Sequence, residues 1–87
     1  MAAVPLGSVS AMSEIEILSF NLKKIRRELD ESQIDFAANC GISVEELSLL
    51  ERGRSDPKMS TLQKIAAYTG KTVSELLTED GDMVYTF

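Results

Sequence analysis

One stretch decides how this chain folds: Gln33-Ile-Asp-Phe-Ala-Ala-Asn-Cys-Gly-Ile-Ser-Val-Glu-Glu-Leu-Ser-Leu-Leu-Glu-Arg52. Its pattern predicts two short helices that are joined by a tight turn. Gly41 can adopt the positive φ that ends the first helix, a conformation that a side chain disfavours. Ala37 is small enough to let the second helix cross closely. The apolar underside of the second helix consists of Ile42, Leu47 and Leu50. The second helix is therefore expected to form a ridge on the surface.

Capping signals predict five helices in total. In each case a Ser or Thr is followed three residues later by an acid or a Gln, a spacing at which the two residues can cap a helix start reciprocally. The pairs are Ser13/Glu16, Ser32/Asp35, Ser43/Glu46, Ser60/Gln63 and Thr72/Glu75. Outside the motif, apolar periodicity predicts helices over about 14–29, 61–68 and 73–77. The fold class is therefore expected to be all-α.

The apolar positions of these outer helices define an expected core. In the first helix, the buried stripe is expected to be Leu18, Leu22, Ile25 and Leu29, and the outer face Lys23, Lys24, Arg26 and Arg27. In the last two helices, the inward positions are expected to be Leu62, Ile65, Ala66, Val73, Leu76 and Leu77. Helical spacing of this kind is typical of helices that bury one face against their neighbours.

Composition excludes several classes of function. The 87 residues suit one domain, and no separate small-molecule domain is expected. The chain has no histidine, which excludes Ser-His-Asp and Cys-His catalysis, and its single cysteine, Cys40, cannot form an intrachain disulfide. We expect no enzyme activity, no metal and no cofactor. No apolar run is long enough to span a membrane, and the first residues lack a signal-peptide pattern, so a cytoplasmic protein is expected.

Charge is distributed unevenly along the chain, although the net charge is −5. Residues 21–71 hold all nine Lys and Arg against eight acids, while residues 1–20 and 72–87 hold acids only. Any binding to nucleic acid is therefore expected to depend only modestly on salt.

The two ends differ from the domain between them. Residues 1–12 are expected to be a flexible lead or an added remnant, with Met12 as an alternative natural start and no basic arm for DNA. Residues 13–78 are expected to form the domain, and residues 79–87 an acidic linker and an apolar tail. Alternation in the tail favours a short strand with Met83, Tyr85 and Phe87 on one face. Two alternatives stay open for the tail: a frayed terminus or a dimer contact.

The motif resembles the helix-turn-helix of the lambda-repressor/Cro type, the XRE family. The matching residues are Gln33, Ala37, Gly41, Gly53, Pro57, Thr61, Leu62, Ile65 and Ala66, in the family's order and spacing. The resemblance covers about residues 21–77. It implies a five-helix DNA-binding domain whose second motif helix, Val44 to Arg52, lies in the major groove.

The resemblance also assigns roles to residues. The base-reading residues would be Val44, Glu45, Ser48 and Leu49, and the phosphate-binding residues Gln33, Ser43, Arg52, Arg54 and Lys58. The alternative for Gln33 is a helix-start residue without a ligand, and for the basic loop a solvated surface. Glu46 is assigned to capping and is not counted as a base reader. The acidic Glu45 and the apolar Leu49 depart from the polar recognition face that is usual in the family.

Two functions follow from this reading. The first is a sequence-specific transcription regulator that binds double-stranded DNA, namely a repressor that recognises an inverted repeat as a homodimer. The alternative is a protein-interaction module on the same fold, such as an antitoxin-like or antirepressor partner. The acidic charge and the exposed apolar Leu49 favour the alternative.

Overall fold

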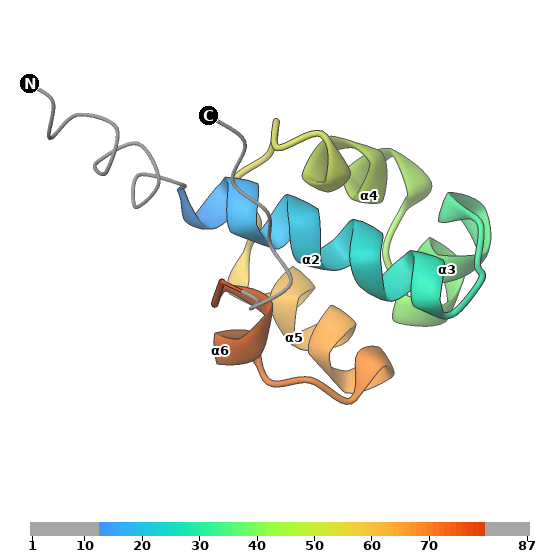
Figure 1. Cartoon of the computed structure of the whole chain (residues 1–87). Coiled ribbons are helices and arrows are strands. Elements are labelled where there is room, and N and C mark those ends of the chain that lie inside the picture. Colours follow the sequence, from blue (N-terminus) through green and yellow to red (C-terminus); the bar gives the residue numbers. More distant parts are fainter. Residues whose placement is uncertain (1–12, 80–87) are drawn as a thin grey trace, which may run out of the picture.

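Five helices follow one another in the computed structural model, which describes residues 13–79. They are α2 (Glu14–Glu28), α3 (Gln33–Cys40), α4 (Val44–Glu51), α5 (Met59–Thr69) and α6 (Val73–Leu76) (Figure 1). No strand occurs within residues 13–79. The prediction of an all-α, five-helix domain is confirmed. The predicted lead, residues 1–12, and the predicted tail strand lie outside the described residues.

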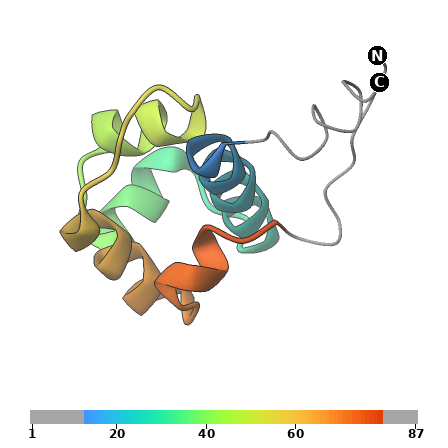
Figure 2. The same ribbon diagram turned by 90° about the vertical axis from the view of Figure 1, so that its left-hand side faces the viewer.

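The helix α2 is the central element of the arrangement. It contacts both α4 and α6, while α3 packs against both α4 and α5. The helix α5 also packs against α6, and the helices surround a common interior (Figure 2). In the view of Figure 1, α4 lies above α2 and α6 lies below it.

Every helix contributes apolar side chains to one core. Its members are Leu18, Leu22, Phe36, Ala37, Cys40, Leu47, Leu50, Leu62, Ile65, Ala66 and Leu76. The rings of Phe36 and Tyr68 pack edge to face at a centroid distance of 5.7 Å, a geometry that aromatic pairs favour. Burial, together with the nearby charge of Glu31, raises the pKa of the Cys40 thiol to about 11. Cys40 therefore behaves as a small apolar core residue.

Local signals explain where most helices begin and end. Ser13 and Glu16 form a reciprocal capping box at the start of α2, and Thr72 and Glu75 form another at α6. Gly41 ends α3 with a φ of 83°, as the sequence predicted. Each cap satisfies backbone N–H or C=O groups that a helix end leaves unpaired.

Two of the other predicted capping pairs are only half formed. The hydroxyl oxygens of Ser32 and Ser43 accept hydrogen bonds from the backbone N–H groups of Asp35 and Glu46, but a return bond completes the box only at α2 and α6. At Glu46 the carboxylate accepts instead from the Thr61 hydroxyl at 2.7 Å. The assignment of the Glu46 side chain to capping was therefore wrong.

The prediction that Ser60 and Gln63 cap the start of a helix was wrong. The helix α5 begins at Met59, and its N-cap residue is Lys58, which makes no side-chain capping bond. The Leu62 N–H already donates to the Lys58 carbonyl oxygen at 3.1 Å, so Ser60 lies inside the first turn.

The buried stripe of α2 is shorter than predicted. Leu29 is 46% exposed, whereas Leu18 and Leu22 are completely buried. Leu29 is the C-cap residue, one residue beyond the end of α2, and Asp30 follows it with a φ of 56°, so the chain turns away from the core at the position where the periodicity placed a buried residue.

The neighbours Leu49 and Leu50 provide a matched test of this core. Leu50 is 1% exposed and Leu49 is 40% exposed, on the same helix. We expect Leu50→Ala to lower the free energy of unfolding by about 2 to 5 kcal/mol, because it leaves a cavity in the core. Leu49→Ala should change it by only about 0.5 kcal/mol. Urea unfolding followed by circular dichroism would measure both, and equal losses would contradict this packing.

Candidate nucleic-acid interface

The helix α4 has one face in the core and one face in solvent. Leu47 and Leu50 are almost completely buried, which fixes the rotation of the helix about its axis. Ser43 caps its start through a hydrogen bond from the Glu46 N–H at 3.0 Å. After the helix, Gly53 has a φ of 67°, and the chain leaves in a loop over residues 54–58. The residues between the buried positions therefore point outward.

The outward face of α4 and the start of α3 together form a shallow hollow of about 450 Å³. Its lining consists of Gln33, Val44, Glu45, Ser48, Leu49 and Arg52. These include all four residues predicted to contact bases. Ser43, Arg54 and Lys58 are exposed outside this lining, Ser43 at the start of α4 and the other two on the loop before α5. The structure thus brings six predicted residues together, and their roles toward DNA stay predictions.

The orientation of α4 depends on Glu51, which sequence reasoning missed. Glu51 is only 4% exposed, although it is charged. One carboxylate oxygen, Oε2, accepts from Arg26 Nε at 2.7 Å. The other, Oε1, accepts from Arg26 Nη2 and from Gln33 Nε2, both at 2.9 Å. A buried carboxylate is tolerated only when it is paired and hydrogen-bonded in this way. Glu51 therefore joins α4 to both α2 and α3.

A signal for this network is present in the sequence. Glu51 lies four residues after Leu47, so it shares the buried side of the helix and requires a partner. The backbone of the same residue is also held, because the Ser19 hydroxyl donates to the Glu51 carbonyl oxygen.

The sequence placed Arg26 on the solvated outer face of α2. This prediction was wrong. Its side chain is 19% exposed, and its guanidinium holds the Glu51 carboxylate from two nitrogens. A third nitrogen, Nη1, donates to the Glu31 carbonyl oxygen at 3.0 Å. The hydrogen bond to Glu51 raises the pKa of Arg26, so the guanidinium stays charged. Arg26 is thus a structural cation rather than a free one.

Gln33 stands at the junction of the network and the hollow. It is the first residue of α3, and one N–H of its amide nitrogen is used by Glu51. An amide nitrogen carries two N–H groups, so the second remains for an acceptor that enters the hollow. The N-terminus of α3 adds its own partial positive charge at the same place.

Charge around the hollow is mixed. The exposed bases Arg52, Arg54 and Lys58 follow α4 along the chain, while Glu45 is exposed on the helix itself. The Nε of Arg52 donates to the Ser48 carbonyl oxygen at 3.3 Å, which leaves its two terminal nitrogens available to an anion.

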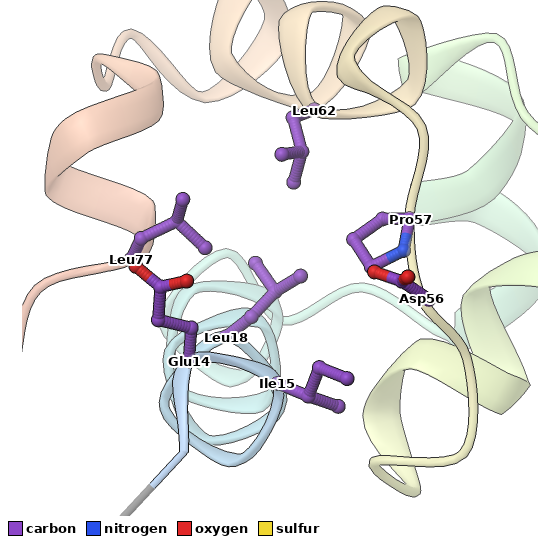
Figure 3. A pocket seen from close by; sticks show the side chains of 7 residues that line it. All are labelled: Glu14, Ile15, Leu18, Asp56, Pro57, Leu62 and Leu77. Carbon is purple, nitrogen blue, oxygen red and sulfur yellow. The ribbon is translucent and has the colours of Figure 1, made fainter.

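A second, more enclosed hollow of about 190 Å³ lies away from this face (Figure 3). Its lining comes from α2, the loop before α5, α5 and the end of the domain: Glu14, Ile15, Leu18, Asp56, Pro57, Leu62 and Leu77. The volume is below the roughly 300 to 1,000 Å³ of typical ligand sites. Within residues 13–79 no cluster of His, Cys, Asp and Glu could hold a metal ion. No helix there is both long and apolar enough to cross a membrane.

Comparison with known proteins bears on this face. A family model described as Helix-turn-helix matches residues 22–76. The HTH-type transcriptional regulator DdrOP3 of Deinococcus deserti is 45% identical over 56 residues, which are 64% of this chain but only 43% of that protein. The uncharacterized HTH-type transcriptional regulator y4dJ of Sinorhizobium fredii is 36% identical over 63 residues, or 72% of this chain and 82% of the relative.

Two further similarities extend over most of the domain. The control protein C.MunI of a Mycoplasma species is 39% identical over 70 residues, which are 78% of this chain and 95% of that protein. Among solved structures, the hypothetical transcription factor NHTF from Neisseria superposes with a TM-score of 0.68 at 30% identity, covering 72% of each chain.

The Glu51 network generates a prediction about stability. Arg26→Ala should lower the free energy of unfolding by about 3 to 5 kcal/mol, because it leaves a buried carboxylate without its cation. Replacing both partners, Arg26→Met with Glu51→Met, should restore much of this loss. Urea unfolding measures all three chains. If the single variant is as stable as the parent chain, Glu51 does not depend on Arg26.

Proposed function

The chain belongs to the helix-turn-helix family of DNA-binding transcription regulators, and on this premise we propose that it binds an inverted repeat in double-stranded DNA as a homodimer. The observation that carries the proposal is the hollow formed by Gln33 and the outward face of α4. It combines a protruding helix, for the major groove, with the start of a second helix, for the phosphate backbone. In this proposal the helix from Val44 to Arg52 is the recognition helix.

Base recognition is proposed for the four outward residues of α4. Val44 and Leu49 suit apolar contacts with thymine methyl groups. The Ser48 hydroxyl can donate or accept, and the Glu45 carboxylate can accept from the amino group of cytosine. Glu46 has no part in this set, since Thr61 holds its carboxylate.

Phosphate contacts are proposed on both sides of the recognition face. Gln33 would donate its second amide N–H to a phosphate while its first stays on Glu51. Ser43, at the start of α4, would donate its hydroxyl while its oxygen caps the helix. Arg52, Arg54 and Lys58 would bind the backbone beyond the end of α4. Such contacts position a protein on DNA without selecting a sequence.

The homodimer follows from the size of the recognition surface. One short helix can contact only a few base pairs, and two copies on an inverted repeat double that number. We place the contact on the side of α6, because α6 packs against α2 and α5 and is separate from α3 and α4, which carry the proposed recognition face (Figure 1). Val73 and Leu77 are half-buried there and offer apolar surface to a second copy.

Repression is the proposed mode of regulation, since a domain that occupies a promoter can block it by binding alone. The chain would act in the cytoplasm, where it shares a compartment with DNA. No cofactor or separate small-molecule domain enters this proposal.

A second candidate is a protein-interaction module on the same fold. The observation that favours it is the exposure of Leu49, which is 40% exposed beside the acidic Glu45. An apolar side chain rimmed by charge also suits a protein partner.

Selection of DNA from a random-sequence pool at several salt concentrations separates the two candidates. The regulator predicts enrichment of an inverted repeat whose half-sites lie about one helical turn apart. Enrichment of no sequence, even at low salt, would contradict the regulator and support the protein-interaction module.

The proposed phosphate contacts predict a change in salt dependence. Arg52→Ala should weaken binding to specific and non-specific DNA alike, and should flatten the slope of log K against log salt by about one unit. Lys64→Ala is the matched control, because Lys64 is an exposed base on α5 outside the hollow. Equal slopes for Arg52→Ala and the parent chain would remove Arg52 from the interface.

The proposed base contacts predict a change in sequence preference. Glu45→Gln replaces an acceptor by a group that also donates and pairs naturally with adenine. The preferred half-site should therefore change, and non-specific affinity should rise because one negative charge leaves the surface. The measurement is selection from the same random pool. An unaltered preference with unaltered affinity would place Glu45 away from the DNA.

A further inference from the structure

A second surface of the domain lies on the outer side of α2 and has no part in the proposed DNA contact. It is a groove of about 490 Å³ lined by Phe20, Lys23, Lys24, Arg27 and Glu28. Phe20 is the aromatic residue of this lining, and the aliphatic stems of its three bases can add apolar surface while their charges stay in water. The groove therefore suits a segment that combines apolar side chains with acids.

The C-terminal tail, residues 79–87, has this composition. It contains the acids Glu79, Asp80 and Asp82, and it has no Lys or Arg. Its apolar residues are Met83, Val84, Tyr85 and Phe87. The tail thus complements the groove in charge and in polarity.

The chain also enters the tail beside this groove. The side chain of Asn21 is buried, and its Nδ2 donates to the carbonyl oxygens of Leu76 at 2.8 Å and Thr78 at 3.1 Å. Asn21 follows Phe20 directly in α2, so these bonds fasten the end of the domain next to the groove.

The length of the tail is sufficient to cover the groove. Nine residues reach about 30 Å when extended. The rise of α2 from Phe20 to Glu28 is only about 12 Å at 1.5 Å per residue. Thr78, directly before the tail, is hydrogen-bonded to Asn21 of the same helix. Because this bond holds the start of the tail near the groove, the effective concentration of the tail there is high.

We propose that the C-terminal tail docks onto the outer groove of α2 in its own chain, with Tyr85 or Phe87 against Phe20. The acids Asp80 and Asp82 then lie near Lys23, Lys24 and Arg27. This assignment differs from a tail that serves as a dimer contact, and it does not depend on DNA binding. It explains how an acidic, apolar segment and a basic, aromatic helix face coexist in so small a chain.

A single tryptophan tests the proposal, because the chain has none of its own. Phe20→Trp places a fluorescent ring in the lining of the groove in the full chain. Acrylamide quenching of this ring should rise by roughly twofold when Tyr85→Ser and Phe87→Ser are added, since the ring then loses the apolar cover that kept it from water. The matched control is Ile34→Trp, at a position that is 68% exposed on α3, where the tail substitutions should change nothing.

Three results would overturn the proposal. The first is equal quenching at Phe20→Trp with and without the tail substitutions. The second is protection that disappears on dilution, which would assign the cover to the tail of a second copy. The third is protection that appears only when DNA is added, which would assign the basic face to phosphates.

A second measurement avoids any substitution in the groove. In the parent chain, nuclear Overhauser contacts should join the ring protons of Phe20 to those of Tyr85 or Phe87. A sample that mixes isotope-labelled and unlabelled chains should show these contacts within one chain only. Their absence, or their appearance between chains, would overturn the proposal.

Discussion

The domain depends on one buried carboxylate. Glu51, at the end of α4, receives hydrogen bonds from Arg26 on α2 and from Gln33 on α3. Since an unpaired charge in this position would be strongly unfavourable, the three helices must keep the arrangement in which the bonds form. Apolar packing alone would tolerate small rotations of α4, but these directional bonds do not. The network therefore fixes which side chains of α4 face outward.

This constraint connects stability to the proposed function through Gln33. The same amide that completes the pairing of Glu51 stands in the hollow with Val44 and Ser48. A shift of α3 relative to α4 would break the bond to Glu51 and separate the proposed phosphate contact from the proposed base contacts. Gln33 thus serves both to position the proposed recognition helix and, in the proposal, to anchor the domain on the DNA backbone.

Local chemistry was predictable from the sequence, and tertiary pairing was not. The turn at Gly41, the caps at Ser13 and Thr72, and the apolar side of α4 each depend on residues a few positions apart, so their patterns could be recognised. The roles of Arg26, Glu46 and Ser60 depend on partners or backbone bonds that only the packed helices supply. Leu29 was placed in the core because its periodicity is helical, but the chain turns at Asp30 and leaves it exposed. The residues of the hollow could be predicted because most of them share one face of a helix. The hydrogen-bond network behind the hollow could be predicted only if Glu51 had been recognised as a buried residue.

The most direct test of this account is the footprint of DNA on the domain. Backbone amide chemical shifts can be recorded in the full chain while a DNA fragment selected from a random pool is added. The account predicts that the largest changes occur at the start of α3, along α4 and in the loop over residues 54–58. Saturable binding that leaves the amides of α4 unchanged would contradict it.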